Sequence, residues 1–206
     1  MTSLLVNHIL QTEKWTSPEL FETKNRIYTF LNPVSYLIAL ENKSLFEQFD
    51  GIFADGSLLV SAIRLVYGKR VTRRSFDMTS LAPELLNYLM ESRKTLYIVA
   101  SGQEQVECSV RIFQEQYPKL RIAGFRNGYF SSDAEMNKEA SHIVELNPDF
   151  LIVGMGALMQ EKFLLKVKKM GYQGIGFTCG GFVHQTAMNR MHYYPDWGDK
   201  MNLGFV

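Results

Sequence analysis

The segment from Leu151 to Lys162 combines glycines and polar side chains in an order that suits anion binding. An apolar run ends in Gly154-Met155-Gly156, and Gln160 and Glu161 follow in the first turn of a helical pattern. A strand that stops at glycine lets a ligand approach the backbone, and the N–H groups of the next helix favour anions. The Gln160 amide and the Glu161 carboxylate are suited to hold a sugar or a uracil edge. The pattern predicts a phosphate or nucleotide site at the carboxyl edge of a parallel sheet, with a plain tight turn as the alternative.

Asp55 stands at the end of another short strand pattern, with Gly56 behind it. A carboxylate in this position lies at the sheet edge where ligands bind, and it is suited to act as a general base. The alternative is an N-cap for a helix over 57–66. Asn32 ends the first predicted strand, and its amide either orients a substrate hydroxyl or satisfies turn backbone.

Arginines and further glycines complete the predicted substrate site. Arg73 and Arg74 can hold a diphosphate through bidentate hydrogen bonds, unless they belong to a solvated loop. Two more strand patterns end in glycine, one at Gly102 and one at Gly180-Gly181. Because glycine permits close ligand approach, we expect these three glycines and Gly56 to contact the substrate.

The sequence offers little for a metal or a redox cofactor. Its four histidines and two cysteines have no metal-ligand spacing, and no Asp-x-Asp triplet occurs. Gly154-Met155-Gly156 resembles half of a dinucleotide fingerprint, but Met159 occupies the place of the third glycine. The acid expected about 20 residues further on is also absent. We predict no cofactor and no bound metal, and keep an NAD-dependent oxidoreductase only as an alternative.

Composition limits the class of protein. With 206 residues, 46% of them hydrophobic and 13% aromatic, the chain suits one globular domain, assigned to residues 1–206. A formal net charge of +1 gives no general attraction to nucleic acid. Two cysteines are too few for a disulfide scaffold and favour a reducing, cytoplasmic setting. No apolar run reaches the roughly 18 residues expected of a membrane span.

Strand-like and helix-like stretches alternate along the chain. The predicted strands cover 26–31, 51–54, 95–100, 120–124, 149–153 and 174–178. The predicted helices cover 33–40, 57–67, 134–146 and 161–170, and a further helix follows the third strand and ends near 117. Such alternation produces right-handed crossovers and a mostly parallel sheet. The expected fold is α/β, a Rossmann-like three-layer sandwich.

A series of short motifs extends over about residues 26–200. In order, it comprises Asn32-Pro33, Ala54-Asp55-Gly56, Phe76-Asp77, Tyr117-Pro118, Gly124, Gly128-Tyr129-Phe130, Asn147-Pro148-Asp149, Gly154-x-Gly156-x-x-x-Gln160-Glu161, Gly180-Gly181-Phe182 and Pro195-x-Trp197. In order and spacing, this series resembles the bacterial WecG/TagA/CpsF glycosyltransferases, glycosyltransferase family 26.

The resemblance implies inverting, metal-independent transfer of a sugar from a UDP-sugar to a polyprenyl-diphosphate-linked saccharide. Family members act in teichoic acid, enterobacterial common antigen or capsule synthesis, and the sugars implied are N-acetylmannosamine, its uronic acid or glucose. Asp55 matches the family's proposed general base, and Asn32 lies in the acceptor or sugar pocket. Gln160 and Glu161, with the two glycines before them, fall in the nucleotide-sugar site.

Some positions depart from the family pattern. Leu158 replaces the usual proline before the Gln-Glu pair, and His184 replaces an aspartate after the second glycine pair. The family's Arg-x-x-Gly-x-Asp pattern is shifted, so either Arg73 or Arg74 fills the arginine role. We also expect the arginine-bearing C-terminal segment, which in members covers the site and meets the membrane, to be missing. A nucleotide-sugar-binding partner with little activity of its own therefore stays as an alternative.

Membrane contact, if any, is expected to be peripheral, at the inner face of the cytoplasmic membrane. Lys162, Lys166, Lys168 and Lys169 make one predicted helix basic. Near anionic lipid, each such charge contributes roughly 1 kcal/mol, and the alternative is an ordinary solvated face. The sequence leaves open whether the chain forms a homo-oligomer or works with a partner subunit.

Overall fold

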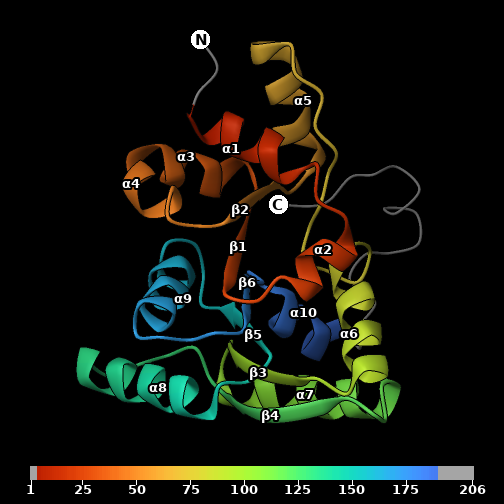
Figure 1. The fold of residues 1–206 in the computed structure, drawn as a ribbon, viewed down its shortest axis with the longest axis vertical. Coiled ribbons are helices and arrows are strands. Elements are labelled where there is room, and N and C mark those ends of the chain that lie inside the picture. The colour runs from red at the N-terminus through yellow and green to blue at the C-terminus, as the bar shows by residue number, and fades with distance from the viewer. Residues whose placement is uncertain (1–3, 190–206) are drawn as a thin grey trace.

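One six-stranded β-sheet forms the centre of the molecule (Figure 1). The computed structural model describes residues 4–189. All neighbouring strands run parallel, in the order β2-β1-β6-β5-β3-β4, which confirms the predicted parallel sheet. The strands are β1 Arg26–Leu31, β2 Gly51–Ala54, β3 Thr95–Ala100, β4 Arg121–Arg126, β5 Phe150–Gly154 and β6 Ile175–Thr178.

Helices cover both faces of the sheet. One face carries α2 (Ser17–Glu22), α6 (Leu81–Ser92), α7 (Gln103–Gln116) and α10 (Phe182–Asn189). The other face carries α1 (Leu4–Thr12), α3 (Pro33–Glu41), α4 (Lys43–Phe46), α5 (Ser57–Tyr67), α8 (Asp133–Leu146) and α9 (Met159–Lys169). Because a separate apolar core fills the space on each side, the predicted three-layer α/β fold is confirmed.

The inner strands are mostly apolar because both of their faces are buried. In β5, Phe150 and Ile152 belong to one core, while Leu151 and Val153 belong to the other. The edge strand β4 differs, since its residues alternate between exposed and half-buried positions. The sequence pattern of each strand therefore reports its place in the sheet.

Predicted and observed elements agree best in the parts that alternate strand with helix. The strand β4 extends to Arg126, two residues beyond its predicted end, and α9 begins at Met159, two residues before its predicted start. Helices α1, α2, α4, α6 and α10 were not predicted. In α6, leucines at 81, 85, 86 and 89 give a buried helical face, a spacing that is visible in the sequence. The predicted motif Pro195-x-Trp197 lies outside the described residues.

The topology places a crevice between β3 and β5, which are neighbours in the sheet. The helix that follows β3 is α7, on one face, whereas the helix that follows β5 is α9, on the opposite face. Ligands of open parallel sheets bind outside the carboxyl ends of the strands at such a switch point. The fold alone thus directs attention to Ser101-Gly102 and to Gly154-Met155-Gly156.

Candidate active site

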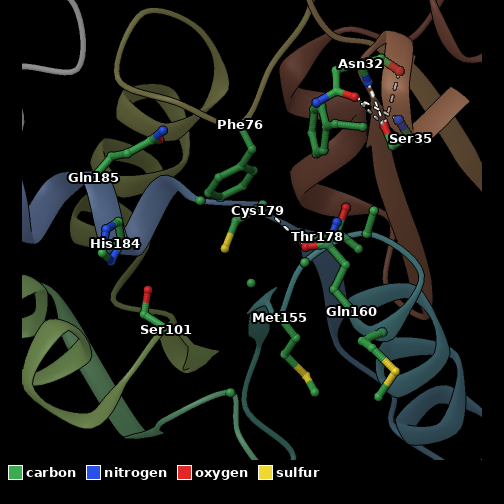
Figure 2. A pocket seen from close by; sticks show the side chains of 18 of the residues that line it. Asn32, Ser35, Phe76, Ser101, Met155, Gln160, Thr178, Cys179, His184 and Gln185 are labelled. Atoms are coloured by element: carbon green, nitrogen blue, oxygen red, sulfur yellow. Dashed lines mark hydrogen bonds between the residues drawn. The ribbon is translucent and has the colours of Figure 1, made fainter. Parts of the chain in front are cut away.

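A cavity of about 1090 Å³ opens at this carboxyl edge. Its wall includes residues that follow all six strands, and Figure 2 shows side chains from several elements surrounding the same space. Nine predicted site residues line it: Asn32, Asp55, Gly56, Gly102, Gly154, Gly156, Gln160, Gly180 and Gly181. Three predicted site residues do not line it: Arg73, Arg74 and Glu161.

Asp55 directly follows β2, and its backbone N–H donates to the carbonyl of Leu31 at the end of β1. Its side chain is one-third exposed and lines the cavity. Burial raises the pKa of Asp55 to about 6, although the charge of Arg73 opposes the shift and that of Asp77 adds to it. Gly56, with φ of +87°, starts α5 immediately behind, a conformation that glycine adopts without strain. An ionised carboxylate with this pKa is poised to accept a proton near neutral pH.

Arg73 lies beside Asp55 instead of pointing into the cavity. Its Nε is 3.9 Å from Asp55 Oδ1, and its second guanidinium nitrogen donates to Asp77 Oδ2 over 3.0 Å. Asp77 is itself fixed, because the backbone N–H and hydroxyl of Thr79 both donate to its other oxygen. Arg73 therefore sets the charge around Asp55, which differs from the diphosphate contact predicted for it.

Arg74 points elsewhere. Its backbone N–H donates to the carbonyl of Ala54, which ties this loop to the end of β2. Its guanidinium donates to the carbonyl of Trp15 and lies over the ring of Phe53, 5.3 Å from the centroid. The structure thus gives Arg74 a packing role and leaves the predicted diphosphate contact without support at this residue.

Asn32 has one of the two roles that the sequence left open, that of satisfying backbone at the turn. Its side-chain oxygen accepts from the backbone N–H of Ser35 over 2.9 Å and caps α3. Within residues 4–189 its amide nitrogen has no hydrogen-bond partner, and the residue lines the cavity. Asn32 therefore caps the helix through its side-chain oxygen, and its contact with a substrate stays a prediction.

A buried polar network supports the cavity floor. Glu161 is fully buried, and its carboxylate accepts hydrogen bonds from the Thr29 hydroxyl, the Gln160 amide and the Leu158 backbone N–H. Gln160 in turn accepts from the backbone N–H of Gly180 over 3.1 Å. Burial raises the pKa of Glu161, and these donors oppose the rise. Glu161 positions Gln160 from below the floor, whereas the sequence predicted that both would contact ligand.

The two glycine turns beside the floor pack against each other. A Cβ atom on Gly154 would lie 2.6 Å from the carbonyl oxygen of Gly180 and 2.9 Å from Cys179 Sγ. Only glycine fits this approach without displacing backbone, so the turn after β5 and the turn after β6 form one surface. Burial raises the pKa of the Cys179 thiol to about 12, which keeps it protonated and unreactive.

Several helices begin at the cavity. The N-cap residues Asn32 of α3, Gly56 of α5 and Gly102 of α7 all line it, and Met159 opens α9 there. The first N–H groups of a helix lack partners within it, and the helix dipole places partial positive charge at this end. The cavity is therefore suited to an anion even though the predicted arginines lie outside its lining.

The sequence profile of the "Glycosyl transferase WecG/TagA/CpsF family" matches residues 9–206. The chain belongs to this glycosyltransferase family. Among curated relatives, it is 31% identical to a Shigella boydii UDP-Gal:alpha-D-GlcNAc-diphosphoundecaprenol beta-1,4-galactosyltransferase, over 96% of this chain and 78% of the relative. It is 23% identical to the Bacillus subtilis (strain 168) N-acetylglucosaminyldiphosphoundecaprenol N-acetyl-beta-D-mannosaminyltransferase, over 86% of this chain and 68% of that protein.

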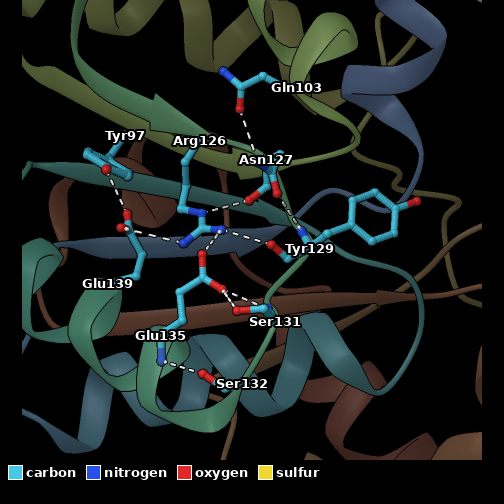
Figure 3. A network of polar contacts seen from close by, with 9 residues as sticks. All are labelled: Tyr97, Gln103, Arg126, Asn127, Tyr129, Ser131, Ser132, Glu135 and Glu139. Atoms are coloured by element: carbon cyan, nitrogen blue, oxygen red, sulfur yellow. Dashed lines mark hydrogen bonds and ion pairs between the residues drawn. The ribbon is translucent and has the colours of Figure 1, made fainter.

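The loop after β4 is a part of this glycosyltransferase site that the prediction of individual residues missed. Gly128, Tyr129 and Phe130 line the cavity, although they were recognised only as a family motif. Figure 3 shows Arg126 at the centre of the contacts that hold this loop. Its guanidinium donates to the carbonyls of Asn127 and Tyr129 and lies 3.9 Å from the Phe130 ring centroid. Ion pairs with Glu135 at 3.2 Å and Glu139 at 3.9 Å anchor it to α8.

Other lining residues of the glycosyltransferase come from the helix starts. Ser101 has φ of +56°, a strained conformation for serine, and its backbone N–H donates to the carbonyl of Gly154. On α10, His184 is exposed, whereas the side-chain oxygen of Gln185 is buried without a partner among residues 4–189. Ser101 could have been found in the sequence from the strand end at Ser101-Gly102. His184 and Gln185 could have been found because they follow the Gly180-Gly181 pair closely.

No three His, Cys, Asp or Glu side chains within residues 4–189 gather in a way that could hold a metal ion. In the same part of the chain, no helix is both long and apolar enough to cross a bilayer.

Proposed function

We propose that this protein transfers a sugar from a UDP-sugar to a polyprenyl-diphosphate-linked saccharide, with inversion at the anomeric carbon and without a metal ion. The observation that carries the proposal is the position of Asp55. Its carboxylate lines the same cavity as the glycine turns after β5 and β6 and the N-terminal ends of several helices. A proton acceptor thus shares one space with groups that favour a diphosphate.

Asp55 is the base of the proposed reaction. One of its oxygens accepts the proton of an acceptor hydroxyl while the hydroxyl oxygen forms a bond to the anomeric carbon. The bond from that carbon to the UDP oxygen breaks, and UDP leaves with the electron pair. Such a single displacement needs one carboxylate, whereas a retaining mechanism requires a second group as nucleophile. The pKa of about 6 makes Asp55 largely ionised at pH 7 and still basic enough to accept a proton.

The leaving diphosphate is stabilised by backbone N–H groups at the glycine turns and helix starts. The N-terminal ends of α7 and α9 lie on the two sides of the crevice between β3 and β5, where a diphosphate can contact both. Preorganised N–H donors aimed at developing negative charge lower an activation barrier substantially. Gln160 and the side-chain oxygen of Gln185, which has no partner among residues 4–189, are suited to bind polar edges of the nucleotide or the sugar.

The relatives guide the choice of substrates. Both of their names specify a β-linked product on an N-acetylglucosamine-diphosphate-undecaprenol acceptor, and one names UDP-galactose as donor. Because the sugar of a UDP-hexose is α-linked, a β-linked product requires inversion. We therefore propose N-acetylglucosaminyl-diphosphoundecaprenol as the acceptor class. UDP-galactose, UDP-N-acetylmannosamine, its uronic acid and UDP-glucose are the donors to test.

The proposal is tested by incubating purified protein with each UDP-sugar and the N-acetylglucosaminyl-diphospholipid in the presence of EDTA. We expect one donor to give a disaccharide lipid and an equal amount of UDP, with β configuration by NMR. Product formed only after Mn²⁺ or Mg²⁺ is added would refute the metal-free mechanism. An α-linked product would refute inversion, and no product from any donor, with or without metal, would contradict the proposed reaction.

A further inference from the structure

Helix α5 carries apolar residues on both its buried and its exposed side. Leu59 and Ile63 are buried against the body of the protein, as expected for a helix that covers a sheet. Leu58, Leu65 and Val66 point outward and are 64%, 87% and 68% exposed. Positions 58, 62 and 65 fall on one side of a helix, and position 66 lies one turn after 62. Leu58, Ala62, Leu65 and Val66 therefore form a continuous apolar stripe, which we name the α5 face. Figure 1 shows α5 at one end of the molecule.

The chain adds apolar area beside the α5 face. Helix α3 starts next to α5, since a Cβ on Gly56 would lie 3.9 Å from the Pro33 ring. On α3, Val34 and Leu37 are both more than half exposed. Apolar patches of this kind, on a soluble domain, mark surfaces that contact another phase or another protein.

Positive charge accompanies the α5 face. Arg64, Lys69 and Arg70 are exposed within the same segment or just after it. From Gly56 to Phe76 the sequence contains no aspartate or glutamate. In space, the carboxylate of Glu13 accepts from the backbone N–H of Thr72 near the end of this segment. An apolar stripe whose own segment carries cations and no acidic residue fits the surface of an anionic bilayer, where the side chains enter the lipid and the cations meet headgroups. The same charges would repel one another across an interface between two copies of this face.

The α5 face is continuous with the cavity. Leu58 belongs to the stripe and lines the cavity, and Pro33 at the start of α3 does the same. Under the proposed function, on which this inference rests, the acceptor saccharide must reach Asp55 while its lipid stays in a membrane. We propose that the α5 face docks on an anionic lipid bilayer and thereby presents the cavity to the lipid-linked acceptor.

Two of the four lysines of α9 considered in the sequence analysis, Lys166 and Lys168, are placed differently. Lys168 forms an ion pair with Asp50 at 2.5 Å, and Lys166 donates to the side chain of Asn137. Asp50 immediately precedes β2, so Lys168 lies near the amino edge of the sheet, whereas the cavity lies at the carboxyl edge. A membrane bound at Lys166 and Lys168 would not face the cavity, which favours the α5 face over this part of α9 as the docking surface.

Vesicle flotation tests the docking surface directly. The wild-type protein is floated with vesicles of phosphatidylcholine alone and of phosphatidylcholine with phosphatidylglycerol. The test variant is Leu65→Gln with Val66→Gln, and the matched control is Leu146→Gln, an exposed leucine on α8. We expect the wild type and the control to float with anionic vesicles and the double variant to bind about tenfold more weakly or worse. Replacing Lys69 and Arg70 with Gln should weaken binding by about fivefold for each charge at low salt.

The outcomes separate docking from folding and from catalysis. Circular dichroism and thermal unfolding check that the variants are folded. Equal vesicle binding by the wild type and the Leu65/Val66 variant would overturn the proposal, as would no vesicle binding by the wild type. A dimer that the double variant converts to monomer, with unchanged vesicle binding, would assign the face to a second copy instead.

Activity assays keep this inference distinct from the proposed function. With an acceptor on a short, water-soluble chain, the double variant should match the wild type. With the polyprenyl acceptor in anionic vesicles, its rate should fall about tenfold. If no transfer occurs in either assay, the proposed function fails, while flotation still decides whether the α5 face binds lipid.

Discussion

Arg73 Nε lies 3.9 Å from Oδ1 of Asp55, close enough to influence its charge but too far for a hydrogen bond. The guanidinium is held back by its 3.0 Å contact with Asp77. Asp55 therefore keeps a carboxylate that is not engaged by a strong donor from Arg73. A base that is stabilised too strongly by an ion pair is a poor proton acceptor, so this spacing preserves basicity in a partly buried group.

Replacing Asp55 with Asn should abolish most transfer and spare donor binding. The amide keeps the shape of the side chain but cannot accept the proton, so we expect a loss of about 10³-fold in kcat. UDP affinity, measured by isothermal titration, should change less than about threefold, because the proposed diphosphate contacts come from other residues. Wild-type turnover by this variant would exclude Asp55 as the base.

The raised pKa of Asp55 makes two pH predictions. Activity requires the ionised form, so kcat/KM should fall as the pH decreases through about 6.

The stability of the fold should change with pH in the opposite direction. The folded state holds the proton of Asp55 more tightly than the unfolded state, in which the pKa of this group is near 3.8. This group's contribution to stability is therefore lost as the pH rises from about 4 to about 6. At pH 7 the Asp55→Asn variant should be more stable by about 1 kcal/mol, after allowance for solvent screening. Thermal unfolding at pH 4 and pH 7 measures the difference, and an equal gain at both values would contradict it.

Arg73→Gln should move the acidic limb of the activity profile to higher pH. Arg73 lowers the pKa of Asp55, so its loss lets burial and Asp77 raise that pKa further above 6. We expect a larger loss of activity at pH 6 than at pH 8. Arg74→Gln is the control, since Arg74 contacts Trp15 and Phe53 instead. An equal shift of the limb in both variants would indicate a general structural effect.

Glu161→Ala should destabilise the fold by about 3 kcal/mol. The change leaves the hydroxyl of Thr29, the amide of Gln160 and the N–H of Leu158 without their acceptor in a buried site. Urea unfolding measures the loss, and Glu145→Ala, at an exposed position of α8, should stay within about 0.5 kcal/mol of the wild type. If Glu161→Ala unfolds with the same free energy as the wild type, the network adds nothing to stability.

Gly154→Ala and Gly181→Ala form a matched pair. The added methyl at 154 would meet backbone at 2.6 Å, whereas at 181 the nearest atoms are side-chain atoms of Gln185 at 3.5 Å. We expect Gly154→Ala to cost about 2 kcal/mol in stability and to weaken UDP binding, because the two turns are pushed apart. Gly181→Ala should unfold like the wild type. Similar unfolding of both variants would mean that the turns can separate at little cost.

Most of the fold could be predicted from the alternation of buried strands and helices along the sequence. Parallel strands buried on both faces leave apolar runs that are easy to read, and β5 is an example. Helix α4 has four residues and no strong pattern, so no local signal predicts it, whereas the leucine spacing of α6 was present and was overlooked. The order of the strands in the sheet depends on contacts between distant segments, which no local pattern specifies.

The site was predicted best where a residue follows a strand directly. Asp55 and Asn32 line the cavity because the carboxyl ends of parallel strands share one edge. Sequence spacing was less informative for Arg73 and Arg74, whose side chains point in different directions and do not line the cavity. Arg73 approaches Asp55, while Arg74, the next residue, packs on Phe53. Which of two adjacent side chains faces inward depends on the path of the loop, and sequence spacing does not determine that path.

Each wall of the cavity comes from a different stretch of chain, because all six strands end there. Short peptides such as 127–131 lie outside the ladder that joins the strands. In a scaffold built in this way, a small insertion or replacement in one loop can change the specificity for the hexose. Such modularity makes this protein a practical starting point for engineering glycan diversity by grafting loops.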